Sequence, residues 1–217
     1  MGIAKKINWE SIFIFLFLII FPFGQIIRMN FTFAGLTIPL TPLDLIAGLA
    51  AVFTIFFQKK EPGFFKYILY FLFAAAFSYL LSVPIFKADA VYGLFYLFRI
   101  LAYAYFFVYV WNFARKSESN KELLINSLIA VSAVSAIFGW YQYFTVPDLK
   151  PLYYIGWDMH LYRLAGTFLD STFLALIIVF GLILLMNKYV DTKNHKLLPI
   201  IIFLLVSLAF TYTRAAY

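Results

Sequence analysis

The chain has 217 residues, of which 65% are hydrophobic and 12% are charged, and it carries a formal net charge of +7. Soluble domains carry about 25% charged residues, so this composition indicates an integral membrane protein without a sizeable soluble domain. Cationic loops in such a protein follow from membrane topology and lipid headgroups, so we expect no nucleic-acid partner. The absence of cysteine excludes disulfides and thiolate metal ligands.

Apolar stretches long enough to cross about 30 Å of hydrocarbon recur along the whole chain. We therefore predict an all-α fold, a polytopic membrane bundle of about seven transmembrane helices. Residues 1–144 are predicted to form a five-span N-terminal region, and residues 145–217 an outer loop with the start of a second membrane block. Lys and Arg gather in alternate connecting segments, which favours a cytoplasmic N-terminus under the positive-inside rule. The predicted spans are 9–27, 42–58, 65–86, 90–113, 122–144, 169–187 and 197–213.

Two segments have the pattern of a helix N-terminus. Thr41-Pro42-Leu43-Asp44 combines a capping threonine, a proline in the first turn and a carboxylate near the positive end of the helix dipole. Asp44 is therefore predicted to be a helix cap rather than a proton carrier. Thr167-Phe168-Leu169-Asp170 has the same form, and it predicts that Thr167 caps the sixth span.

Arg99 lies near the middle of the apolar run from 91 to 111, where a guanidinium costs a few kcal/mol. Helical spacing puts Tyr92, Tyr96, Arg99 and Tyr103 on one face, which we expect to face protein or water rather than lipid. An intramembrane arginine is a candidate functional residue. The alternative is a structural role, in which Arg99 pairs with tyrosine hydroxyls or backbone carbonyls.

Two further arginines lie on the predicted outer side, Arg163 just before the sixth span and Arg214 just after the seventh. The planar guanidinium binds phosphate through two parallel hydrogen bonds. Backbone N–H groups at Gly166 and Thr167, at a helix N-terminus, would add to an anion site. We therefore predict a pyrophosphate site formed by Arg163, Arg214, Arg99, Gly166 and Thr167. The alternative for Arg163 and Arg214 is separate contact with lipid phosphates at the membrane surface.

The sequence assigns no catalytic side chain. His160 lies in the long outer loop and has the chemistry of a general base, but it lacks a paired carboxylate at a fixed spacing, so a solvated loop histidine is favoured. Neither a metal-binding motif nor a phosphate-binding glycine loop is present, so we expect no metal and no cofactor.

The two arginines belong to segments that carry a family resemblance. Arg163-Leu164-Ala165-Gly166-Thr167-Phe168 precedes two predicted spans, and Thr211-Tyr212-Thr213-Arg214-Ala215-Ala216 follows them, with the arginines 51 positions apart. This order resembles the O-antigen ligase and polymerase group of bacterial envelope enzymes, where an R-L-x-G-T-F segment precedes a T-x-S-R-(G/A)-(A/G) segment. The chain departs from that pattern where Thr213 replaces the usual serine, and where an asparagine-proline-asparagine-like turn is absent after Phe168.

The resemblance implies transfer of a glycan from an undecaprenyl-pyrophosphate carrier to an acceptor glycan or glycolipid, at the outer face of the bacterial inner membrane. It implies a metal-independent glycosyltransferase in which the arginines stabilise the pyrophosphate leaving group. Because members of the family are longer, the chain is expected to be an N-terminal part that is inactive alone. The alternatives are a small polytopic transporter, although no repeat symmetry is visible, or a structural membrane partner.

Overall fold

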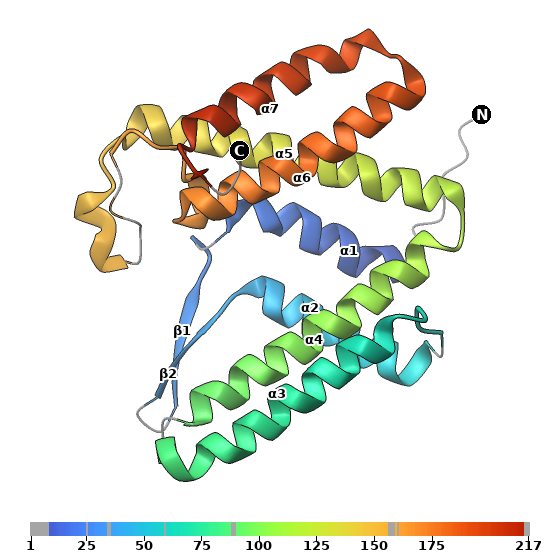
Figure 1. Ribbon diagram of the computed structural model, residues 1–217, viewed down its shortest axis with the longest axis vertical. Coiled ribbons are helices and arrows are strands. Elements are labelled where there is room, and N and C mark those ends of the chain that lie inside the picture. The colour runs from blue at the N-terminus through green and yellow to red at the C-terminus, as the bar shows by residue number, and fades with distance from the viewer. Residues whose placement is uncertain are drawn as a thin grey trace. The chain divides into compact units, whose positions relative to one another are not determined.

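The structure is a computed structural model, and it describes residues 9–24, 26–33, 36–58, 60–87, 90–155, 159 and 161–214. These residues are mostly helical (Figure 1). The α-helices within the described part are α1 (Trp9–Ile20), α2 (Pro42–Phe57), α3 (Phe65–Phe86), α4 (Ala90–Ala114), α5 (Glu118–Thr145), α6 (Ser171–Thr192) and α7 (Leu198–Phe210). Short 3-10 turns are η1 (Phe21–Phe23), η3 (Lys150–Ile155), η4 (Gly166–Phe168) and η5 (His195–Leu197).

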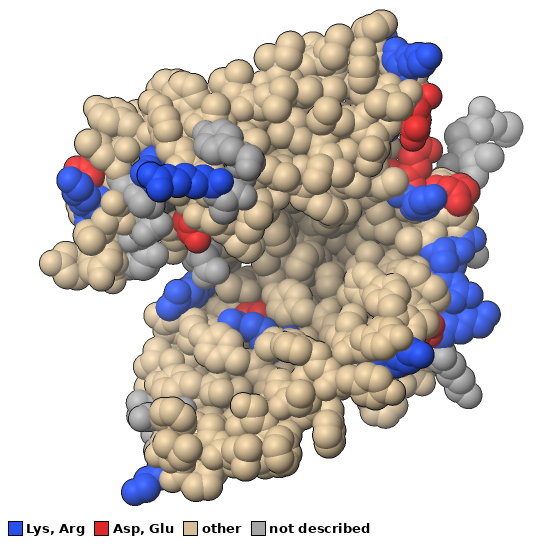
Figure 2. Space-filling model, viewed as in Figure 1, with Lys and Arg blue, Asp and Glu red and all other residues tan. Residues whose placement is uncertain are grey.

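Four of the described helices, α3 to α6, are long and apolar enough to cross a membrane. The 16 residues of α2 and the 13 residues of α7 extend only about 24 Å and 20 Å, against about 30 Å of hydrocarbon. Figure 2 shows wide uncharged areas between small groups of charged side chains, as such helices require. The prediction of a mostly helical chain with membrane-spanning helices is therefore confirmed in this coarser form, while the number of seven spans and the orientation stay predictions.

An antiparallel hairpin, absent from the all-α prediction, lies between α1 and α2. Strand β1 (Met29–Phe33) pairs with β2 (Leu36–Leu40). Several of its side chains are aromatic or β-branched, which favours strands, and Pro39 is tolerated because a two-stranded sheet has only edge strands. The hairpin ends one residue before Thr41, so it sets the position at which α2 begins.

The chain divides into two units, each with its own packing. The first comprises Met1–Phe17 and Arg28–Lys121. In it, α4 packs against both α2 and α3 (Figure 1). Tyr109 of α4 is only 1% exposed, and the rings of Phe13 and Phe53 meet its ring edge-on at centroid distances of 6.1 and 5.8 Å. Aromatic packing around Tyr109 thus holds α1 and α2 against α4.

The second unit comprises Leu18–Ile27 and Glu122–Tyr217. Helices α6 and α7 form an antiparallel pair connected through η5 (Figure 1). Polar side chains link this pair to α5: the Ser132 hydroxyl donates to the Ile177 carbonyl at 3.0 Å, and the Trp140 indole N–H donates to the Ser207 hydroxyl at 2.9 Å. The three helices therefore share one core, strengthened by interhelical hydrogen bonds.

Gly181 of α6 leaves no room for a side chain, because a Cβ there would overlap the Cβ and hydroxyl of Ser132. We expect Gly181→Ala to lower the free energy of unfolding by about 1–3 kcal/mol through overpacking. The measurement is thermal unfolding of the purified protein in detergent.

Gly48→Ala in α2 is the matched control. A Cβ at Gly48 meets no heavy atom within 4 Å, so alanine should stabilise the helix by about 0.5–1 kcal/mol. If both variants unfolded at the same midpoint, the close contact between α5 and α6 would be contradicted.

Candidate functional site

The first turn of α2 is a capping box. The Asp44 amide donates to the Thr41 hydroxyl at 3.4 Å, and the Thr41 amide donates to the Asp44 carboxylate at 2.8 Å. The Thr41 hydroxyl also donates to Asp44 Oδ2 at 2.9 Å. The prediction that Asp44 caps this helix is confirmed.

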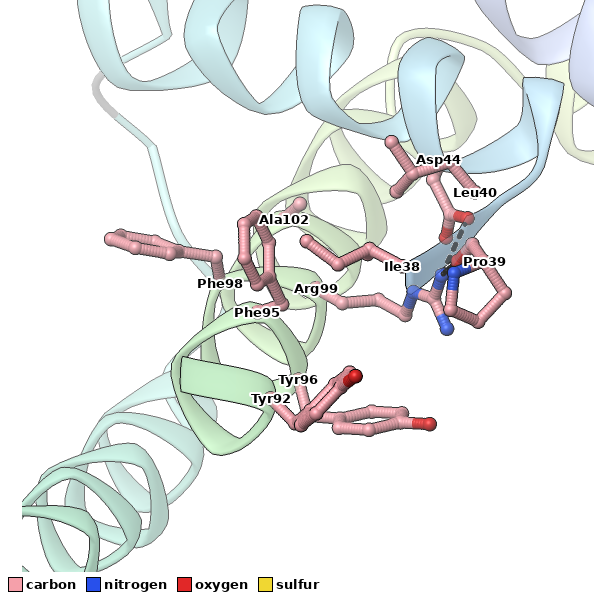
Figure 3. Close-up of a pocket in the computed structure, with 10 residues that line it drawn as sticks. All are labelled: Ile38, Pro39, Leu40, Asp44, Tyr92, Phe95, Tyr96, Phe98, Arg99 and Ala102. Atoms are coloured by element: carbon pink, nitrogen blue, oxygen red, sulfur yellow. Dashed lines mark hydrogen bonds and ion pairs between the residues drawn. The ribbon is translucent and has the colours of Figure 1, made fainter. Parts of the chain in front are cut away.

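Arg99 reaches from α4 to this capping box (Figure 3). Its Nη2 donates to Asp44 Oδ2 at 2.9 Å and to the Pro39 carbonyl at 2.6 Å. The Tyr103 hydroxyl donates to the other carboxylate oxygen of Asp44 at 3.1 Å. One guanidinium thus joins the end of β2, the first turn of α2 and the middle of α4. Sequence reasoning considered a backbone carbonyl as a partner of Arg99, but it missed the carboxylate.

A pocket of about 210 Å³, which we call the Arg99 pocket, lies beside this cluster in the first unit. Arg99 and Asp44 form its polar end, and side chains of β2 and α4 form the remaining walls. Tyr92 and Tyr96 line it with Arg99, as their helical spacing predicted, and the Arg99 guanidinium carbon lies 5.7 Å from the Tyr96 ring centroid (Figure 3). This distance is within the range of a cation–π contact.

The second unit brings the two segments of the family resemblance together. The Leu164 amide donates to the Phe210 carbonyl at 3.1 Å, so the segment that begins at Arg163 lies beside the end of α7, four residues before Arg214. Arg163 is partly exposed and Arg214 is exposed, and neither has a hydrogen bond or an ion pair with another residue of the described ranges. No described residue therefore uses the donors of either guanidinium group.

Gln142 of α5 anchors the segment that begins at Arg163 through hydrogen bonds to its backbone. Its side-chain oxygen accepts hydrogen bonds from the Ala165 and Gly166 amides at 3.0 and 3.2 Å, and its side-chain nitrogen donates to the Val146 carbonyl at 3.0 Å. Gly166 has φ +60°, and a Cβ there would lie only 3.3 Å from the backbone nitrogen of Gly139. The sequence did not predict that Gln142 clamps this loop, although an amide side chain in an apolar span indicates that it has a hydrogen-bond partner.

The structure corrects the expected start of the sixth helix. Thr167 is buried and its hydroxyl donates to the Pro22 carbonyl, while Leu169 adopts a left-handed conformation with φ 65° that ends the η4 turn. Helix α6 begins only at Ser171, and its cap is Asp170, whose carboxylate accepts from the Thr172 amide at 2.7 Å. The prediction that Thr167 caps this helix is therefore wrong. The Gly166 amide, expected to be available for an anion, is bonded to Gln142.

Left-handed backbone conformations flank both arginines. Tyr162 has φ 53° and Tyr212 has φ 50°, in addition to Leu169. Such conformations in non-glycine residues cost of order 1–3 kcal/mol each and cluster at functional sites. The backbone around Arg163 and Arg214 is therefore held in a specific, unfavourable shape by its buried neighbours.

Arg99 does not belong to the same unit as Arg163 and Arg214. Arg99 belongs to the first unit, where its partners are Asp44 and Pro39. His160 lies outside the described residues, as do the two alanines that follow Arg214. Within the described ranges, no group of three or more His, Asp or Glu side chains could hold a metal ion. Comparison of the chain with protein-family profiles, with curated proteins and with solved structures finds no match.

The pairing of Arg99 with Asp44 can be tested by a double-mutant cycle. Arg99→Gln and Asp44→Asn are each expected to lower the free energy of unfolding by about 1–3 kcal/mol, since each leaves the other charge without its partner in a partly buried site. The double variant should cost less than the sum of the single variants by about 1 kcal/mol. Chemical unfolding in detergent measures all three values.

Lys121→Gln is the control, because its pair with Glu118 is exposed and should contribute little to stability. Additive effects of the two substitutions at Arg99 and Asp44 on the free energy of unfolding would contradict a stabilising ion pair between them.

Proposed function

We propose that this chain is a multi-pass protein of the bacterial inner membrane that takes part in glycan transfer from an undecaprenyl-pyrophosphate-linked donor. The proposal follows the resemblance to the O-antigen ligase and polymerase group, and it includes seven spans with a cytoplasmic N-terminus. One observation carries it: the hydrogen bond between Leu164 and Phe210 joins two arginine-bearing segments that are far apart in the sequence. This contact supports a shared anion site for Arg163 and Arg214.

The chemistry of such a transfer suits these two side chains. The acceptor oxygen forms a bond to the anomeric carbon of the donor sugar, the bond between that carbon and the pyrophosphate oxygen breaks, and the electron pair leaves with the pyrophosphate. Two guanidinium groups aimed at the leaving group would neutralise this charge as it develops. The proton of the acceptor hydroxyl goes to a base that the described residues do not identify.

The restricted backbone of the Arg163 segment also supports the proposal. Electrostatic stabilisation is effective when the donors are fixed before the reaction. The clamp from Gln142, the buried Leu164 and the left-handed backbone at Tyr162 all restrict the Arg163 segment. A mere contact with lipid headgroups at the membrane surface would not require this restriction.

The proposed pyrophosphate site is smaller than the one predicted from the sequence. Asp44 already neutralises Arg99, the Gly166 amide donates to Gln142, and the Thr167 hydroxyl donates to Pro22. We therefore assign Gly166 and Thr167 to shaping the segment rather than to binding the ligand. Arg163 and Arg214 remain as the proposed ligands of the pyrophosphate.

Arg163→Gln and Arg214→Gln should each weaken the binding of undecaprenyl pyrophosphate by about tenfold or more, because a charge-assisted hydrogen bond contributes about 1.5–3 kcal/mol. Arg163→Lys should give an intermediate loss, since lysine keeps the charge but not the bidentate geometry. Titration of the purified protein in lipid nanodiscs, followed by native mass spectrometry, measures these affinities.

Lys150→Gln is the matched control, because Lys150 is an exposed cation of the same unit that lies outside both segments. It should bind undecaprenyl pyrophosphate as the unaltered chain does. An unchanged affinity for undecaprenyl pyrophosphate in both arginine-to-glutamine variants, with normal membrane insertion, would contradict the proposal.

A further inference from the structure

The Arg99 pocket has donor capacity that no described residue uses. A guanidinium carries five N–H donors, and the hydrogen bonds of Arg99 to Pro39 and Asp44 both come from Nη2. Nη1 and Nε make no hydrogen bond to any residue in the described ranges, and the side chain is 30% exposed. One charged donor group therefore remains available to a ligand at the polar end of the pocket.

Asp44 is already bonded to three residues. Its Oδ2 accepts from Thr41 and Arg99, its Oδ1 accepts from Tyr103, and its side chain is only 13% exposed. A cation entering the pocket would meet a carboxylate that is already paired with Arg99. The pocket is thus suited to a group that accepts hydrogen bonds from Arg99.

The neighbouring carboxylate limits the charge of that group. Asp44 cancels the charge of Arg99, so a group with several negative charges, such as a pyrophosphate, would be repelled by Asp44 at close range. A group with a single negative charge gains the hydrogen bonds of Arg99 with much less repulsion. A phosphodiester has this charge.

The remaining walls of the pocket are apolar or aromatic. Ile38 and Leu40 of β2 face it, as do Phe95 and Ala102 of α4. Figure 3 shows Arg99 extended toward Pro39 and Asp44, with the Tyr92 and Tyr96 rings beside it. Its volume of about 210 Å³ is below the roughly 300–1,000 Å³ of pockets for whole drug-sized ligands, so it accommodates only part of a larger molecule. A ligand with a charged group and an attached apolar chain matches these walls.

The position of the pocket along α4 identifies the source of such a ligand. Helix α4 is a candidate membrane span of 25 residues, about 37 Å long, which exceeds the about 30 Å of hydrocarbon. The pocket residues Tyr92 to Ala102 lie within the first 13 residues of this helix, which extend about 20 Å from its start. The pocket therefore extends from one edge of the hydrocarbon layer, beside the lipid phosphates, toward its middle, beside the lipid chains.

We propose that the Arg99 pocket binds one phospholipid, with its singly charged phosphate on the available N–H groups of Arg99 and the start of an acyl chain against Ile38, Leu40 and Phe95. This site lies in the first unit and does not depend on the proposed role of Arg163 and Arg214. The bound lipid fills the space between β2 and α4.

The test uses the purified chain and three probes: phosphatidylglycerol, a diacylglycerol with the same acyl chains, and inorganic phosphate. Native mass spectrometry of a titration series measures the affinity of each. We expect one tight phosphatidylglycerol site, at least tenfold weaker binding of diacylglycerol, and no binding of inorganic phosphate at millimolar concentration. Equal affinity for diacylglycerol would overturn the role of the phosphate, and tight binding of inorganic phosphate that Ala102→Phe abolishes would overturn the lipid as the ligand.

A variant that fills the pocket tests its location without touching the ion pair. Ala102→Phe should weaken phosphatidylglycerol binding at least tenfold, because the larger side chain occupies the pocket while Arg99 and Asp44 stay in place. Ala74→Phe is the control, since Ala74 is an exposed position of α3 outside the pocket, and it should leave binding unchanged. Thermal unfolding of both variants verifies that they fold. Equal binding by folded Ala102→Phe and the unaltered chain would overturn the assignment to this pocket.

Discussion

A polar group at membrane depth has no water to bond with, and this constraint determines where the long helices of the chain meet. Arg99 is bonded to Asp44 and to the Pro39 carbonyl. Asn112, near the other end of α4, donates to the Gln58 side chain and to the Lys60 carbonyl, at 3.1 and 2.9 Å. The two ends of α2 are thus each tied to α4 by one polar side chain. Among buried side chains of the described residues, only the Ser135 hydroxyl has no hydrogen-bond partner.

Local patterns were predictable where the partners are close in the sequence. The capping box of Thr41 and Asp44 spans three residues, so its chemistry is visible in the sequence itself. The same pattern at Thr167 failed, because a left-handed residue at Leu169 intervenes and the burial of Thr167 directs its hydroxyl to Pro22. The partner of Arg99 lies 55 positions away, beyond any pattern of helical spacing. Only tertiary packing of α2 on α4 determines that pair.

The meeting of the two arginine segments is an intermediate case. Two antiparallel helices joined by a short connection also bring together the two ends that lie away from the connection. The pair of predicted spans therefore already indicated that Arg163 and Arg214 share one side. What the sequence did not provide is the register: the Leu164 amide meets the Phe210 carbonyl because a clamp from Gln142 fixes the loop. Glycine at 166 suits that clamp, since a φ of +60° is strained for a residue with a side chain and a Cβ there would lie only 3.3 Å from the backbone nitrogen of Gly139 in α5.

The two arginine sites differ in their net charge, and this difference separates the ligands that each can hold. Arg99 is paired with the Asp44 carboxylate, so its surroundings are neutral and favour at most one additional negative charge. Arg163 and Arg214 have no acidic partner among the described residues, so their segments carry two positive charges toward a ligand. A pyrophosphate, which has several negative charges, is stabilised only where the positive charges of the protein are not neutralised by a neighbouring carboxylate. Under the two proposals, the pairing with Asp44 therefore assigns Arg99 to a phosphodiester rather than to the pyrophosphate.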